Sequence, residues 1–92
     1  MKILFNINNK EKNFDDLVSM LLSLKNKDQM SLFLNGILTP KEIVEISNRL
    51  LIVKMLRKGI PQQEIAQRIQ VGVATVTRGA REILRGRFNN VK

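Results

Sequence analysis

Hydrophobic residues crowd the stretch from residue 17 to residue 34, where they fall on more than one face of the helices that their spacing predicts. The apolar positions of this stretch are Leu17, Val18, Met20, Leu21, Leu22, Leu24, Met30, Leu32, Phe33 and Leu34. We expect one helix with Asn13 as its N-cap and a second over about residues 28–34, followed by a turn at Asn35 and Gly36. Helices that are apolar on several faces must be covered on several faces, and a chain of 92 residues has too little material to do so alone. A partner subunit is the simplest cover, so these helices predict a dimer.

The clearest helix start lies at Thr39. This residue suits the N-cap, Pro40 suits the first helical position, and Glu42 follows the cap by three residues, which together make a capping box. The helix should end at Lys58 and Gly59, where a basic last turn is followed by a glycine cap. Its inward face is expected to carry Ile43, Ile46, Leu50, Val53 and Leu56. We expect this helix to act as the scaffold between the dimer core and the segment that follows.

Residues 61–85 have the pattern of a helix-turn-helix. Pro61 suits the first turn of a helix, and Ile65, Ala66 and Ile69 then form a short apolar stripe. The pattern breaks near Gln70, a position that is Gly in many such turns because the residue there adopts positive φ. A second helix is then expected to bury Val73, Val76 and Ile83. A plain helical hairpin packed in a core is the alternative interpretation.

The outward side of that second helix fits a surface that reads DNA. The residues expected to point outward are Ala74, Thr75, Thr77, Arg78 and Arg81. Short side chains at a helix N-terminus can approach base edges, and the arginines that follow can hold phosphates. Together with the preceding helix and the turn, the residues expected to meet DNA are Gln62, Gln63, Arg68, Gly72, Val73, Ala74, Thr75 and Thr77.

The charge of the chain is concentrated in its second half. Residues 1–48 carry six basic and six acidic residues, whereas residues 49–92 carry ten basic and two acidic residues. The whole net charge of +8 therefore lies with the helix-turn-helix pattern. Such a distribution is typical of a protein that binds a polyanion. A structural protein–protein adaptor would need no basic half, so the charge argues against that class.

The composition also excludes several kinds of chemistry. With no Cys and no His, the chain has no disulfide, no thiolate or imidazole metal site and no His-based catalysis. The acidic residues are scattered or local to helix starts, so no carboxylate pair stands out for acid–base work. We therefore expect neither an enzyme nor a metal site nor a bound cofactor.

The domain organisation follows from these segments. Residues 1–12 are too short for a signal peptide or a membrane span, and we interpret them as a flexible arm. Residues 13–92 are expected to form a single domain, with dimerisation helices over 13–58 and the helix-turn-helix over 61–85. The absence of Cys agrees with a cytoplasmic protein that does not use a membrane.

Two stretches resemble the tryptophan operon repressor family. They are Leu38-Thr39-Pro40-Lys41-Glu42, with Arg49 and Ile52-Val53 further along, and Val73-Ala74-Thr75-Val76-Thr77-Arg78-Gly79. The resemblance covers about residues 28–85 and implies an all-α fold: a small helical domain with a helix-turn-helix, assembled as an intertwined homodimer. It also implies a repressor that binds double-stranded operator DNA when L-tryptophan is bound as corepressor, and that controls genes of tryptophan biosynthesis or uptake.

The resemblance further implies which residues hold the ligand. Arg49 and Arg78 match the two arginines that stack on the faces of the indole, a contact that suits planar guanidinium groups. Thr39 matches a threonine near the ligand carboxylate, and Gly36 and Leu38 match positions whose carbonyls receive the ammonium group. Taken from the residues alone, Arg49 would be a solvent-facing arginine and Arg78 a phosphate contact.

Two positions depart from the family pattern. Glu82 stands where the family often has Ser near the ligand ammonium; its carboxylate can pair with that ammonium or repel the ligand carboxylate. Gln63 stands where many members have Arg, and Gln favours adenine over guanine. A regulator on the same scaffold that needs no ligand, or that takes another ligand, is therefore the alternative function.

Overall fold

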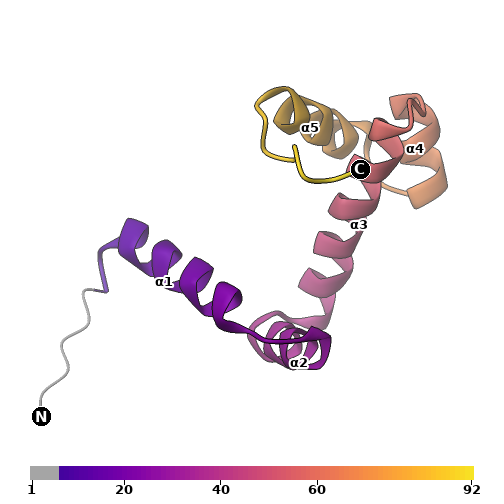
Figure 1. Ribbon diagram of the computed structural model, residues 1–92. Coiled ribbons are helices and arrows are strands. Elements are labelled where there is room, and N and C mark those ends of the chain that lie inside the picture. Colours follow the sequence, from indigo (N-terminus) through magenta and orange to yellow (C-terminus); the bar gives the residue numbers. More distant parts are fainter. Residues whose placement is uncertain (1–6) are drawn as a thin grey trace, which may run out of the picture. The chain divides into compact units, whose positions relative to one another are not determined.

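The computed structural model describes residues 7–92, which form five α-helices and no strand (Figure 1). The helices are α1 (Lys10–Ser23), α2 (Lys27–Ile37), α3 (Pro40–Arg57), α4 (Gln62–Ile69) and α5 (Val73–Leu84). The expectation of an all-α chain is therefore confirmed. The chain divides into two compact units, the first ending at Ile37 and the second beginning at Leu38, so the boundary falls inside the predicted single domain 13–92. Across this described range, no helix has both the length and the apolar character needed to cross a membrane.

The first unit contains α1, which begins earlier than expected. Asn9 is its N-cap, and the Asn9 Oδ1 accepts a hydrogen bond of 3.0 Å from the backbone N–H of Lys12. The prediction of Asn13 as the cap is wrong, because Asn9 offers the same capping side chain one turn earlier and Glu11 adds a favourable charge to the first turn. Residues 10–12 of the predicted arm are thus helical, and residues 1–6 lie outside the described residues.

The second helix, α2, extends beyond the turn predicted at Asn35 and Gly36, so that prediction is also wrong. Asn35 stays in the helix because its side-chain Nδ2 donates a 2.8 Å hydrogen bond to the carbonyl of Ser31, one turn back. The helix ends only after Ile37, shortly before Pro40, whose ring disfavours helical backbone in the residue before it.

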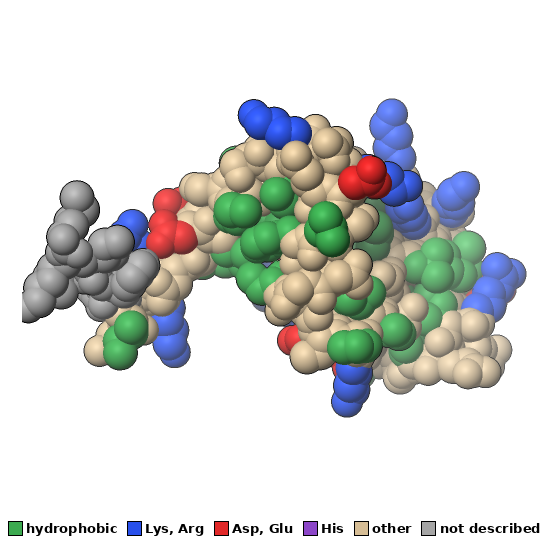
Figure 2. Space-filling model, turned by 90° about the horizontal axis from the view of Figure 1, so that it is seen from below, with side chains coloured by type: hydrophobic (Ala, Val, Ile, Leu, Met, Phe, Trp, Pro, Cys, Tyr) green, Lys and Arg blue, Asp and Glu red, His purple; other side chains and the backbone are tan. Residues whose placement is uncertain are grey.

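Neither α1 nor α2 contains a buried residue in the single chain. Leu22 remains 81% exposed, Leu32 77% and Phe14 66%, and only some of the other apolar side chains of these helices are half-buried. Figure 2 shows hydrophobic side chains lying open on the face that it presents. The two helices of this unit therefore leave apolar surface that they do not cover for each other.

The second unit begins with the predicted capping box, which is confirmed. Thr39 Oγ1 accepts a 3.2 Å hydrogen bond from the backbone N–H of Glu42, and Glu42 Oε1 accepts one of 2.9 Å from the backbone N–H of Thr39. The bond donated by the Thr39 N–H stabilises the charged carboxylate and, with a smaller contribution from the Thr39 side chain, lowers the pKa of Glu42 below its ordinary value. The residues around Thr39 therefore determine where α3 starts.

The core of the second unit lies where α3, α4 and α5 meet (Figure 1). Its fully buried side chains are Ile52, Val53, Ile65 and Val76. Val53, Ile65 and Val76 were expected inside, whereas Ile52 was not. Two other positions expected to face inward on α3, Ile46 and Leu50, are each 46% exposed in the single chain. The buried face of α3 is thus limited to its second half, against the helix-turn-helix.

A glycine lets α5 approach α3 closely. A Cβ atom added to Gly79 would lie 3.2 Å from Cγ2 of Ile52 and 3.6 Å from Cδ1 of Leu56. Ile52 is itself fully buried, so it has little room to move away. Gly79 is therefore the small residue that allows α5 and α3 to pack this closely.

The turn between α4 and α5 contains the expected positive φ. Gln70 has φ 61° and ψ 51°, and it is the one non-glycine residue in the described chain with a left-handed backbone. A side chain in this region costs about 1 kcal/mol relative to glycine.

We expect Gln70→Gly to raise the free energy of unfolding by up to about 1 kcal/mol, because glycine adopts this backbone without steric cost. Urea denaturation followed by circular dichroism measures the change. Gln67→Gly is the matched control: Gln67 is exposed within α4, so glycine there should lower stability by about 1 kcal/mol. If both variants lost the same amount of unfolding free energy, Gln70 would not be strained.

Candidate DNA-reading helix and ligand cavity

The exposed start of α5 presents short side chains to solvent. Ala74 and Thr75 are exposed in its first turn, and Gly72 at the N-cap makes no side-chain capping bond. The amide N–H of Thr75 donates a 3.0 Å hydrogen bond to the carbonyl of Gly72, so the amides that an anion such as a phosphate could meet here are those of the residues before Thr75. On α4, Arg68 is also exposed and forms a 2.6 Å ion pair with Glu64. The geometry agrees with a helix whose first turn meets base edges while nearby arginines meet phosphates.

Thr77 does not point freely outward, so that expectation is wrong. It is half-buried, and its hydroxyl has two acceptors in reach: Gln62 Oε1 at 2.7 Å and the carbonyl of Val73 at 3.0 Å. The bond to Gln62 ties α4 to α5, so these two side chains hold the helices in position. Val73 also differs from expectation, because it is 47% exposed where an inward position was predicted.

A cavity of about 270 Å³ lies between α3 and α5 within the second unit. Its lining residues are Arg49, Ile52, Val53, Thr75, Arg78, Gly79, Glu82 and Phe88. Ile52 and Val53 line it with apolar residues of α3, and Arg49 and Arg78 line it with one basic residue from each of the two helices. Small-molecule sites combine an apolar lining with a few polar groups in this way, and the volume is slightly below their usual range of about 300–1,000 Å³.

The cavity brings together three of the six residues predicted to bind a ligand, namely Arg49, Arg78 and Glu82. Leu38 and Thr39 belong to the same unit but do not line this cavity, and Gly36 belongs to the first unit. Their predicted role in ligand binding stays a prediction.

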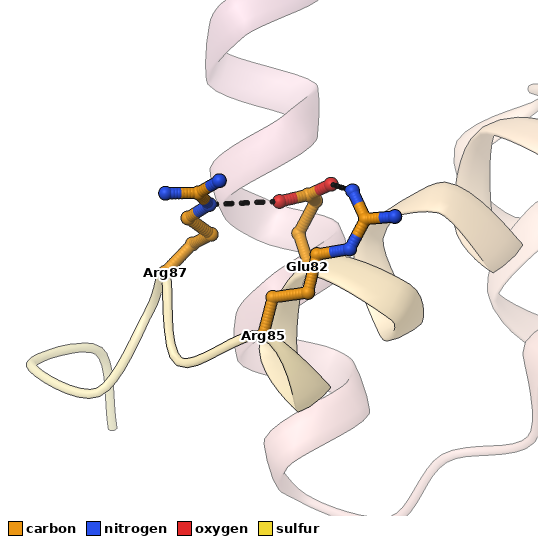
Figure 3. A network of polar contacts seen from close by, with 3 residues as sticks. All are labelled: Glu82, Arg85 and Arg87. Carbon is orange, nitrogen blue, oxygen red and sulfur yellow. Dashed lines mark hydrogen bonds and ion pairs between the residues drawn. The ribbon is translucent and has the colours of Figure 1, made fainter.

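Glu82 is engaged by two arginines that follow it in the chain. Its Oε1 lies 2.9 Å from Nη1 of Arg85, and its Oε2 lies 3.3 Å from Nε of Arg87. Figure 3 shows Arg85 at the end of α5 and Arg87 on the loop beyond it, with the carboxylate between them. Only 20% of the Glu82 side chain is exposed. The negative charge beside the cavity is therefore compensated within the chain.

Five lining residues were not expected at a ligand site, namely Ile52, Val53, Thr75, Gly79 and Phe88. Thr75 was assigned to DNA alone, although its spacing of three from Arg78 and seven from Glu82 places all three on one helix face. Phe88 lies beyond α5 and has no periodic signal. It reaches the cavity because residues 86–92 fold back, and Arg57 Nη2 donates a 2.8 Å hydrogen bond to its carbonyl.

Comparison with known proteins agrees with this geometry. The model of the family described as "Trp repressor protein" matches residues 12–89. A "Trp operon repressor homolog" from Vibrio campbellii is 33% identical over 78% of this chain and 73% of its own length. A homolog of the same description from Xylella fastidiosa is 31% identical over 90% of this chain and 88% of its own length. Another from Vibrio vulnificus is 38% identical over 74% of this chain and 65% of its own length. The chain therefore belongs to the Trp repressor family, a family of DNA-binding transcription regulators that are not enzymes.

Proposed function

We propose that this protein is a sequence-specific repressor that works as a homodimer, binds operator DNA and takes L-tryptophan as its corepressor. The observation that carries the proposal is the cavity beneath α5, which shares Thr75 with the exposed start of that helix. A ligand in this cavity would contact the same helix turn that meets DNA. The cytoplasmic location is part of this proposal.

The lining of the cavity suits a planar, apolar amino acid. Arg49 and Arg78 can stack their guanidinium planes on an aromatic ring, and one of them can also pair with a carboxylate through a forked pair of hydrogen bonds. Ile52 and Val53 offer apolar contact to the ring. Because Arg85 and Arg87 compensate the charge of Glu82, this carboxylate does not repel the carboxylate of an amino acid as an unpaired one would.

The positions of the two arginines couple the ligand to DNA. Arg49 lies on α3, and Arg78 lies on α5, the helix proposed to face DNA. An indole between them would favour one orientation of α5 against α3. If that orientation binds DNA better, tryptophan tightens DNA binding, and DNA tightens tryptophan binding by the same factor.

The proposed homodimer would cover the apolar side chains that α1 and α2 leave exposed. It would also present two copies of α5 to one duplex. In helix-turn-helix dimers, the Trp repressor among them, the two half-sites lie about 34 Å apart, and this spacing is carried over to the present protein.

We expect Thr75 to contribute to the sequence preference of DNA binding and Arg68 to contribute to the affinity for any DNA sequence. A duplex selected from a random library in the presence of tryptophan supplies the operator, which is then compared with an unrelated duplex by fluorescence anisotropy. We expect Thr75→Ala to weaken operator binding up to about tenfold and leave binding to the unrelated duplex unchanged. Arg68→Ala should weaken both and reduce the slope of log K against log salt by about 1.

Because Thr75 also lines the cavity, tryptophan binding to Thr75→Ala is measured in parallel. If Thr75→Ala lost affinity equally for both duplexes, Thr75 would not read bases, and the assignment of the start of α5 to the major groove would fail.

A further inference from the structure

Residues 86–92 are turned back toward α3 by the geometry at the end of α5. The backbone N–H of Gly86 donates to the carbonyl of Ile83 at 3.0 Å, and that of Arg87 donates to the carbonyl of Glu82 at 3.1 Å. With Gly86 at φ 78°, these bonds form a Schellman motif, which ends the helix and reverses the chain. The direction of the segment after α5 therefore has a local cause.

Side chains then hold the reversed segment in place. Nε of Arg87 pairs with Glu82 (Figure 3), and Nη2 of Arg57 donates a 2.8 Å hydrogen bond to the carbonyl of Phe88. The first contact attaches the segment to α5 and the second attaches it to α3. Phe88, which carries the second attachment, also lines the cavity together with Arg49 and Arg78.

We propose that residues 86–92 form a closing wall of the ligand cavity, with Glu82 as the latch that holds the wall and Phe88 as the residue that contacts the ligand ring. The wall makes the site selective for a flat aromatic ring of limited size, because Phe88 presents a ring surface and also bounds the cavity. The identity of the ligand rests on the proposed function, whereas the latch does not.

This assignment gives Glu82 a positioning role. Its Oε2 pairs with the wall through Arg87, while its Oε1 pairs with Arg85, which belongs to the end of α5 itself. The two arginines carry the same charge, so removing either one changes the electrostatics around Glu82 similarly. Of these two arginines, only Arg87 belongs to residues 86–92, so only its removal takes away a contact that holds the wall.

The latch is tested without ligand by amide hydrogen exchange in Arg87→Ala, with Arg85→Ala as the matched control. The amide N–H of Val91 donates to the carbonyl of Phe88 at 3.0 Å, so it reports whether residues 86–92 are folded. We expect exchange at Val91 to be at least about tenfold faster in Arg87→Ala and nearly unchanged in Arg85→Ala. Equal acceleration in the two variants, or none in either, would overturn the latch.

The wall is tested by calorimetry of L-tryptophan binding to Phe88→Ala and Phe88→Leu. Loss of the ring contact should weaken binding about tenfold in Phe88→Ala. Phe88→Leu, which keeps apolar bulk, guards against a folding defect and should give an intermediate loss. Tryptophan binding as tight as in the unaltered protein, or tighter, in Phe88→Ala would show that the ring obstructs the cavity and would overturn the wall.

The two readouts separate failure of this inference from failure of the proposed function. If the unaltered protein bound no tryptophan, the corepressor would be wrong, and the exchange at Val91 would still decide whether Glu82 holds residues 86–92. If tryptophan bound to the unaltered protein and to Arg87→Ala with equal affinity, the proposed function would stand and the wall would be overturned.

Discussion

Replacing Arg78 by alanine is expected to abolish the effect of L-tryptophan on operator affinity. Arg78 lines the cavity from α5 and would supply both a stacking surface and a partner for the ligand carboxylate. Without Arg78, the ligand no longer contacts α5 through this side chain, so its binding no longer changes the affinity for DNA. Such coupling typically changes affinity by about 5- to 150-fold. Fluorescence anisotropy measures the ratio of the operator affinities with and without saturating tryptophan.

Arg81→Ala is the matched control for Arg78. Arg81 is exposed on the same helix, three residues further on, and does not line the cavity. Its loss should lower affinity for every duplex while leaving the ratio with and without tryptophan unchanged. Arg49→Lys, which keeps the charge but not the flat surface, should reduce the ratio. A full response to tryptophan in Arg78→Ala would rule out the stacked geometry.

Leu32→Asp is expected to separate the homodimer into single chains. Leu32 is 77% exposed in the single chain, so aspartate there would cost a monomer little more than the difference in helix propensity, about 0.7 kcal/mol or less. In a dimer that covers α2, the same carboxylate would be buried without a partner, at a cost of several kcal/mol. Sedimentation should give about twice the 10.6 kDa chain mass for the unaltered protein and a single chain mass for the variant.

Leu84→Asp provides the control for the dimer. Leu84 is 88% exposed at the end of α5, in the second unit, and the proposed interface does not use it. This variant should sediment as the unaltered protein does. A folded, monomeric unaltered protein would contradict the dimer, and so would a Leu32→Asp variant that kept the mass of two chains.

Local signals in the sequence predicted the second unit better than the first. The capping box at Thr39 and the positive φ at Gln70 are set by neighbouring residues, so both could be predicted from the sequence. Asparagine is less informative because it favours caps and turns yet also occurs within helices. Asn13 was therefore taken as a cap in place of Asn9, and Asn35 as a turn residue, although its side chain bonds to Ser31 inside α2.

The ligand cavity could be predicted only in part. Arg49, Arg78 and Glu82 came from the resemblance to the family, and Thr75 could have been added from its helical spacing. Phe88 could not, because its position depends on a hydrogen bond from Arg57, 31 residues earlier in the chain. Ile52 was missed for a related reason: its burial depends on the crossing of α3 by α5 at Gly79.

The most direct test of corepression is a titration of the selected operator duplex with the unaltered protein, at one fixed salt concentration, with and without saturating L-tryptophan. Salt is held constant because the basic half of the chain makes all DNA binding depend on it. We expect tryptophan to tighten operator binding by about 5- to 150-fold and to leave binding to an unrelated duplex much less affected. Equal operator affinity in the two titrations would contradict corepression by tryptophan and would identify the protein as a regulator that does not respond to this ligand.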